Sequence, residues 1–156
     1  MTLEENLNVE KFANEYEKFT VNLYFTSSWV FNSRNKVLKE CGLTLQQCNI
    51  LHILNKCYPA PVTVNFLISR MLDKSSNASR IVDKLVAKGF AERVQSKQDK
   101  RAVDVMITKK GLDKMNIEVE PIVNQYYDNF KRSVSENEMK QMNALLDKVR
   151  NMEFYR

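Results

Sequence analysis

Residues 73–95 read DKSSNASRIVDKLVAKGFAERVQ, and this stretch decides the fold. After four polar residues, a helical pattern runs over residues 77–88, and Gly89 is placed to end that helix in the left-handed conformation. Beyond Gly89 the period of the apolar residues changes to two, which predicts strands over residues 90–95 and 102–107. The stretch therefore predicts a helix followed directly by a two-stranded hairpin with a charged tip.

Two further helices are predicted on the N-terminal side of this stretch. They cover residues 45–56 and 63–71, and a T-x-x-Q capping box formed by Thr44 and Gln47 opens the first of them. Two prolines hold the connector between them extended. The helix over residues 63–71, the polar turn, the next helix and the hairpin together are typical of a winged helix-turn-helix.

Longer helices flank this unit. Apolar residues recur at helical spacing over residues 9–39, and Gly42 is placed to end that helix. Thr108 can cap a helix after the hairpin, Pro121 is expected to kink or interrupt it, and a capping box at Ser135–Glu138 opens a last helix. With only three glycines and three prolines in 156 residues, the chain is predicted to be mainly α with a two-stranded β wing.

Positive charge is concentrated in one part of the sequence. The chain has 24 Lys and Arg against 19 Asp and Glu, a formal net charge of +5. Residues 70–110 hold 11 basic and 5 acidic residues, a balance of +6, whereas the remaining residues hold 13 basic and 14 acidic, a balance of −1. A local basic surface favours binding to a polyanion, most commonly nucleic acid, although a basic surface can also have no partner.

Other classes of protein are disfavoured. Neither a secretory signal nor an apolar run long enough for a membrane span is expected, so the protein is predicted to be cytoplasmic, without a membrane partner. The three cysteines show no C-x-x-C spacing and are interpreted as free thiols. With one histidine, no phosphate-binding glycine loop and no evident carboxylate pair, we expect no catalytic, cofactor-binding or metal-binding residues and no enzyme activity.

The helix over residues 77–88 is predicted to enter the major groove of double-stranded DNA. The groove accepts an α-helix, and Ser, Asn and Arg side chains in the first turn can read the donors and acceptors of the bases. Backbone N–H groups at the same end can bind phosphate. Ser75 and Ser76 could instead serve only as helix caps. The predicted DNA-binding residues of this region are Lys74, Ser75, Ser76, Asn77, Ser79, Arg80 and Lys84.

Four short motifs resemble the MarR family of bacterial transcriptional regulators. They are Ser79-Arg80 near the start of the recognition helix, Leu85-x-x-x-Gly89 at its end, Asp99-x-Arg101 at the wing, and Ile107-Thr108-x-x-Gly111 opening the next helix, where the family has Leu in place of Ile107. The resemblance extends over the chain. It implies a single MarR-type domain over residues 1–156, with a winged helix-turn-helix at 44–110 and N- and C-terminal dimerisation helices at 9–39 and 112–153.

The resemblance also implies a mechanism. A homodimer would bind a palindromic operator, repress transcription by covering a promoter, and be released by a small ligand or by oxidation. Arg101 matches the wing arginine that enters the minor groove, and Asp99 matches the carboxylate that orients it, although Asp99 could be a plain turn residue. Lys97 and Lys100 are expected to contact phosphates.

Apolar side chains in the flanking helices support a dimer independently of the resemblance. Exposing all of them would create a patch larger than monomers usually show, although a core within one chain is the alternative. The residues concerned are Phe12, Phe19, Tyr126, Tyr127, Phe130, Leu146 and Val149.

Two hypotheses concern the signal that the protein senses. A small aromatic effector is the favoured one, and no residues are assigned to it. Redox sensing through Cys41, Cys48 or Cys57 is the alternative, because Lys39 and Lys56 flank two of these thiols. Cys48 and His52 are spaced for a metal pair, but two ligands are too few for a zinc site. A winged-helix module for protein contacts is a further alternative function.

Overall fold

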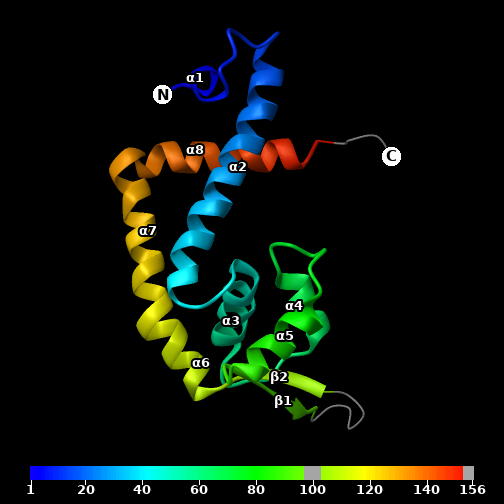
Figure 1. Ribbon diagram of the computed structural model, residues 1–156. Helices are drawn as coiled ribbons and strands as arrows, with labels where there is room; N and C mark the ends of the chain where they lie inside the picture. The colour runs from blue at the N-terminus through cyan, green and yellow to red at the C-terminus, as the bar shows by residue number, and fades with distance from the viewer. Residues whose placement is uncertain (97–102, 153–156) are drawn as a thin grey trace. The chain divides into compact units, whose positions relative to one another are not determined.

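A computed structural model describes residues 1–96 and 103–152 of the 156-residue chain. The chain divides into two compact units, Met1–Leu112 and Asp113–Arg156. Figure 1 labels the elements, which are α1 (Leu3–Leu7), α2 (Glu15–Glu40), α3 (Leu45–Cys57), α4 (Val64–Arg70), α5 (Ala78–Ala87), β1 (Ala91–Gln95), β2 (Val103–Ile107), α6 (Lys109–Asp113), the π-helix η1 (Lys114–Val119), α7 (Glu120–Ser133) and α8 (Glu136–Arg150). The predicted class, mainly α with a two-stranded wing, is confirmed.

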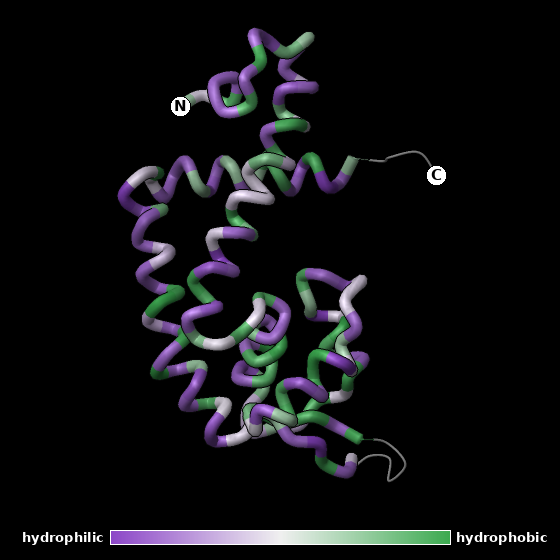
Figure 2. Tube along the Cα trace, in the orientation of Figure 1, coloured by the Kyte–Doolittle hydropathy of each residue, from purple (hydrophilic) through white to green (hydrophobic). Residues whose placement is uncertain are grey.

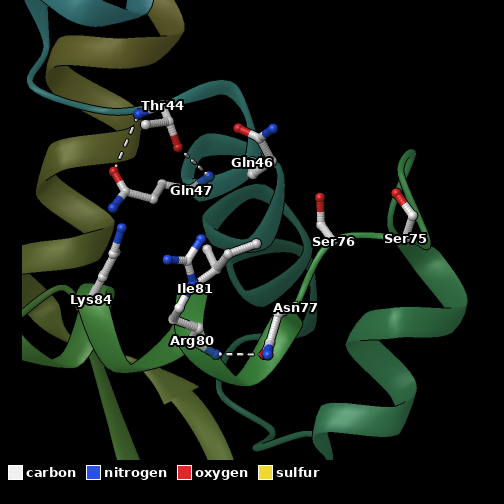
Figure 3. A pocket seen from close by; sticks show the side chains of 9 residues that line it. All are labelled: Thr44, Gln46, Gln47, Ser75, Ser76, Asn77, Arg80, Ile81 and Lys84. Carbon is white, nitrogen blue, oxygen red and sulfur yellow. Dashed lines mark hydrogen bonds between the residues drawn. The ribbon is translucent and has the colours of Figure 1, made fainter.

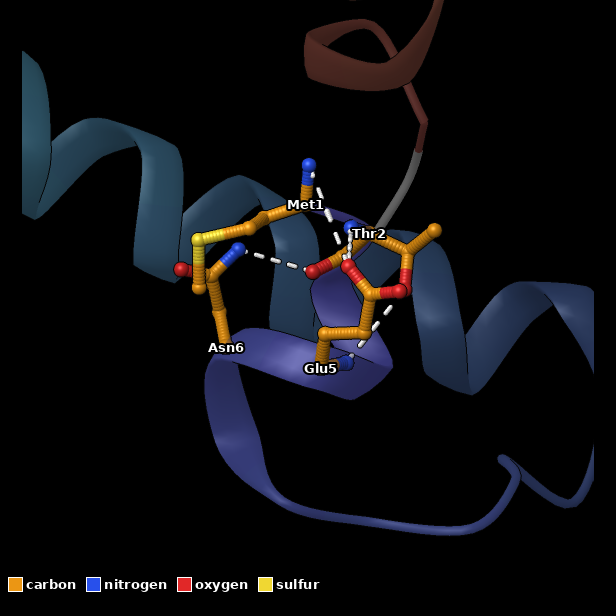
Figure 4. Close-up of polar contacts among 4 residues, drawn as sticks. All are labelled: Met1, Thr2, Glu5 and Asn6. Atoms are coloured by element: carbon orange, nitrogen blue, oxygen red, sulfur yellow. Dashed lines mark hydrogen bonds and ion pairs between the residues drawn. The ribbon is translucent and has the colours of Figure 1, made fainter.

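The N-terminal helix begins later than its apolar pattern predicts. A short separate helix, α1, comes first, and Thr2 and Glu5 form a reciprocal capping box at its start (Figure 4). Asn8 ends α1 in the left-handed conformation, with φ of 54°. Asn14 then caps α2 by accepting hydrogen bonds from the backbone N–H groups of Tyr16 and Glu17, each at 3.0 Å. The predicted start at residue 9 is therefore wrong, because two asparagines end one helix and begin the next.

The capping residues of the central helices are where the sequence predicts them. Gln47 N–H donates to Thr44 Oγ1 at 3.2 Å, and Thr44 N–H donates to Gln47 Oε1 at 3.1 Å, which confirms the capping box of α3. Thr63 caps α4 through the N–H of Phe66 at 3.0 Å. Gly42 ends α2 with φ of 68°, as predicted. Local hydrogen bonds thus set the ends of these helices before any long-range packing is considered.

The core of the first unit lies where α3, α4, α5 and the hairpin meet. Each element contributes side chains that are almost completely buried, and burying an aliphatic side chain of this kind stabilises the fold by roughly 1.5–3 kcal/mol. This packing holds α5 against both α3 and the hairpin. The central buried residues are Ile50, Leu51, Leu54, Leu67, Val82, Leu85, Val105 and Ile107.

The wing is an antiparallel pair in which Ala91 lies opposite Ile107 and Gln95 lies opposite Val103. Val62 adds an isolated bridge to the free edge of β2. The N–H of Val62 donates to the carbonyl of Val105 at 2.9 Å, and the N–H of Val105 donates to the carbonyl of Val62 at 2.8 Å. The predicted alternation of β2 is only partly right. Val105 and Ile107 are buried, but Val103 is 49% exposed because it lies where the described ladder ends.

Gly111 lies in α6 directly against the backbone of the turn that joins α5 to β1. A Cβ atom at this position would lie 2.1 Å from the carbonyl oxygen of Phe90. Thr108 fixes the same corner, because its hydroxyl donates to the carbonyl of Gly89 at 2.7 Å and accepts from the N–H of Gly111 at 3.0 Å. The predicted cap at Thr108 is confirmed.

The second unit consists mainly of α7 and α8, preceded by the π-helical turn η1. The wider turn ends just before Pro121, which occupies the first turn of α7, so the α-helical geometry is interrupted by a π-helical turn while the backbone stays helical. Ser135 and Glu138 form the predicted capping box of α8. Neither α7 nor α8 has a fully buried side chain, and Figure 2 shows hydrophobic residues recurring along both.

Over the described ranges, no helix combines the length and the apolar character that a membrane span requires.

Candidate nucleic-acid interface

The N-terminal end of α5 is organised by Asn77. Its Oδ1 atom accepts a hydrogen bond from the backbone N–H of Arg80 at 3.0 Å, which makes Asn77 the helix cap. The alternative that Ser75 and Ser76 cap this helix is therefore wrong. An asparagine cap uses only its side-chain oxygen, so the amide nitrogen of Asn77 keeps two hydrogen atoms for a further partner.

Ser75 and Ser76 bind Asp73 instead. The Ser75 hydroxyl donates to one carboxylate oxygen of Asp73 at 2.6 Å, and the Ser76 hydroxyl donates to the other at 2.6 Å. The backbone N–H of Ser75 adds a third hydrogen bond at 3.0 Å. These hydrogen bonds, the Ser75 hydroxyl first, lower the pKa of Asp73 below its ordinary value. The turn before α5 is thus built around an exposed carboxylate.

A cavity of about 400 Å³ opens between this turn, the first two turns of α5 and the start of α3 (Figure 3). Both α3 and α5 direct polar side chains into it. The lining residues are Thr44, Gln46, Gln47, Ser75, Ser76, Asn77, Arg80, Ile81 and Lys84.

The cavity brings together five of the predicted DNA-binding residues, namely Ser75, Ser76, Asn77, Arg80 and Lys84. Lys74 and Ser79 are exposed but do not line it. Four lining residues were not predicted to belong to the site, namely Thr44, Gln46 and Gln47 at the start of α3 and Ile81 on α5 itself. Thr44 and Gln47 were recognised only as capping residues, and the one available signal for Gln46 was its place in the first turn of α3, the neighbouring helix of the predicted unit.

Two cations in the cavity are available to an anionic partner. Arg80 and Lys84 form no ion pair with any residue that the structure describes, whereas Arg93 on β1 is engaged with Asp83 at 2.7 Å. Lys88, at the end of α5, is also engaged, because its ammonium donates to the carbonyl of Gly42 at 2.7 Å and to Gln47 Oε1 at 3.3 Å. Lys88 therefore ties α5 to the start of α3, while Arg80 and Lys84 face the cavity.

Four predicted residues of the wing, Lys97, Asp99, Lys100 and Arg101, lie outside the described residues. Their roles in DNA binding stay predictions.

The three cysteine thiols differ in how deeply they are buried. Cys41 and Cys48 are buried, and Cys57 is half-buried. Burial raises the pKa of the Cys48 thiol, which reduces its thiolate fraction at neutral pH. Among the residues that the structure describes, no three His, Cys, Asp or Glu side chains cluster as a metal site would require.

Comparison with protein families gives one match. Residues 43–103 match the model of the MarR family. This segment contains the whole cavity lining from Thr44 to Lys84, together with β1 and the first residue of β2. Residues 43–103 are therefore similar in sequence to the MarR family.

Solved structures with the same fold extend the comparison to almost the whole chain. The S. aureus MepR–DNA complex has a TM-score of 0.73 at 20% identity, over 89% of this chain and 97% of that one. The regulator RdhR-CbdbA1625 bound to 2,4-dichlorophenol has a TM-score of 0.74 at 23% identity, over 91% and 86%. A MarR family transcriptional regulator from Silicibacter pomeroyi has a TM-score of 0.66 at 25% identity, over 84% and 86%.

No curated protein matches the chain in sequence. The chain nevertheless shares its fold with these solved regulators, and residues 43–103 are similar in sequence to the MarR family.

Proposed function

We propose that the protein is a sequence-specific DNA-binding transcriptional regulator that places the start of α5 in a major groove. The observation that carries this proposal is the polar cavity at that end of α5. Ser75, Ser76, Asn77 and Arg80, which forms no ion pair with a described residue, gather there within the segment that matches the MarR family model. A helix start offers free N–H groups to phosphates and short polar side chains to base edges.

The charge distribution supports the same partner. The excess of positive charge lies in residues 70–110, where the balance is +6 against −1 elsewhere. Cations that neutralise phosphates release counterions, so binding should weaken steeply as salt rises. Arg80 and Lys84 supply two such cations without first having to break an ion pair with a described residue.

The test is a fluorescence anisotropy titration against DNA selected from a random double-stranded library and against unselected DNA. The Arg80→Ala variant should bind the selected DNA about 1–3 kcal/mol more weakly. Arg132→Ala, which removes the same charge from an exposed position on α7, is the matched control and should bind as the wild type does. If no salt-sensitive preference for selected DNA is found, the proposal is wrong, and a winged-helix module for protein contacts is favoured.

The functional unit is proposed to be a homodimer formed through helices at residues 9–39 and 112–153, on either side of the winged helix-turn-helix at 44–110. Large apolar side chains exposed on α2, α7 and α8 support it. Two recognition helices related by two-fold symmetry would meet an inverted repeat with half-sites about 34–36 Å apart. Sedimentation showing a monomer at micromolar concentration would refute the dimer. The large apolar side chains that are exposed on these three helices include Phe19, Leu23, Trp29, Tyr127, Met142 and Leu145.

The mode of regulation is proposed to be repression relieved by a small aromatic ligand. RdhR-CbdbA1625, which shares the fold, has been crystallised with 2,4-dichlorophenol. Titrating 2,4-dichlorophenol into the protein–DNA complex should release the DNA and lower its fluorescence anisotropy, with buffer lacking 2,4-dichlorophenol as the reference. An anisotropy that is unchanged at millimolar 2,4-dichlorophenol would argue against this class of effector.

For the wing, Arg101→Ala should weaken binding, with the largest loss on A·T-rich flanks, because a guanidinium fits a narrow minor groove. Asp99→Asn should cause a smaller loss of the same kind if Asp99 orients that side chain. Equal affinity of both variants and the wild type would remove these roles.

A further inference from the structure

We infer that Asp73 holds the hydroxyl hydrogens of Ser75 and Ser76. Both serines then act only as hydrogen-bond acceptors, so that they bind the amino groups of bases and not phosphates. This inference rests on the proposed function and specifies how the same surface discriminates sequence. It depends on the donor and acceptor inventory of three side chains whose contacts the structure gives.

A serine hydroxyl has one hydrogen to donate and two lone pairs to accept with, whereas an ionised carboxylate can only accept. At 2.6 Å from separate oxygens of Asp73, both hydroxyl hydrogens are committed to the carboxylate. Hydrogen bonds of this length from a hydroxyl to a charged oxygen are about twice as strong as neutral ones. Ser75 and Ser76 therefore present only lone pairs to the cavity.

Phosphate oxygens are acceptors and carry negative charge, so they are poor partners for this pair of serines. A phosphate contact would require a hydroxyl to turn away from Asp73 and would bring a second anion beside the carboxylate. In the major groove, the only base donors are the N6 amino group of adenine and the N4 amino group of cytosine. The two serines therefore favour these bases.

Asn77 and Arg80 have the opposite polarity. Because Asn77 Oδ1 accepts from the N–H of Arg80, the free end of the Asn77 side chain is its NH₂ group, and the Arg80 guanidinium has only donors. The same end of α5 thus carries two acceptors next to two donor side chains. Ser75 and Ser76 match amino groups, while Asn77 and Arg80 match O6, N7 or phosphate oxygens.

The first arm of the test removes single amino groups from DNA that the wild type has selected from a random double-stranded library. Purine replaces each adenine in turn, and 2-pyrimidinone replaces each cytosine. At one or two positions per half-site, the wild type should lose about tenfold in affinity. The Ser75→Ala/Ser76→Ala variant should show less than about a twofold loss at the same positions.

The second arm compares Asp73→Asn with Glu92→Gln. Both replace an exposed carboxylate by an amide in the basic segment, but Glu92 on β1 contacts neither serine. In Asp73→Asn one hydroxyl loses its acceptor and is free to donate to phosphate. The preference for selected over random DNA should then fall about tenfold, with a gain in affinity for random DNA, while Glu92→Gln should keep its preference.

The outcomes separate this inference from the proposed function. If the wild type selects no sequence, both fail. If it selects one, but amino removal costs the wild type and the double serine variant equally at every position, only the role of Asp73 and its serines is refuted. Circular dichroism melting of each variant checks that the fold is kept, and unchanged preference in Asp73→Asn would also overturn the inference.

Discussion

Replacing Gly111 by alanine should destabilise the protein, although alanine normally stabilises a helix. Gly111 is buried in α6, and its backbone is not in the left-handed region, so conformational strain is not the cause. The new Cβ would lie 2.1 Å from the carbonyl oxygen of Phe90 and 2.7 Å from Cγ1 of Ile107. One of these contacts is with backbone, which cannot rotate away as a side chain can.

The expected magnitude follows from two opposing contributions. Overpacking a closed site costs typically 1–3 kcal/mol, and a contact with backbone at this distance belongs at the upper end, about 3 kcal/mol. Alanine regains about 1 kcal/mol through its higher helix propensity. The free energy of unfolding should therefore fall by about 2 kcal/mol, which for a chain of this size lowers Tm by about 4–8 °C.

Urea denaturation followed by circular dichroism measures this difference, with Gly42→Ala as the control. No atom lies within 4 Å of a Cβ at Gly42, where φ is 68°, so its cost of about 1 kcal/mol comes from the left-handed backbone alone. Gly111→Ala should be the less stable of the two. A Gly111→Ala protein as stable as the wild type would show that the corner between Phe90 and α6 is not closely packed.

Three further predictions concern local features. Asn77→Ala removes the cap of α5 and should lower the free energy of unfolding by about 1 kcal/mol in urea titrations; no change would contradict the cap. In the native protein, Ellman's reagent should modify Cys57 before Cys48, because burial raises the pKa of Cys48; the reverse order would refute this. Hydrogen bonds from Ser135 lower the pKa of Glu138, so their stabilisation of α8 is present above the ordinary glutamate pKa and is lost on acidification. Glu138→Gln should weaken the loss of helicity measured between about pH 5 and pH 3, and an unchanged acid profile would contradict this.

The ends of helices were predictable where a few neighbouring residues determine them. Thr44 with Gln47 and Ser135 with Glu138 are reciprocal caps, which require residues three apart and no tertiary contact. The break between α1 and α2 depends on equally local residues, Asn8 and Asn14. It was missed because the apolar pattern continues across the break, and periodicity does not register a change of backbone conformation.

The polar residues that α5 and the turn before it contribute to the candidate site were predictable, but those that α3 contributes to the other wall of the cavity were not. Neighbours in sequence identify Ser75, Ser76 and Arg80, whereas Gln46 reaches the same space only because the core packs α3 against α5. The hydrogen-bond partner of Ser75 and Ser76 could not be predicted from the sequence either. Choosing between a helix cap and a hydrogen bond to Asp73 requires the geometry of the turn, since both are local and chemically reasonable.

The boundary between the two compact units falls inside continuous helical backbone. Leu112 and Asp113 are both part of α6, and η1 and α7 follow without an intervening loop. Proteases cut extended, exposed segments, so limited digestion should not separate the units at this point. A shortened chain meant to isolate the winged helix-turn-helix would have to end within a helix, and its new C-terminal carboxylate would add negative charge where the helix dipole is already negative.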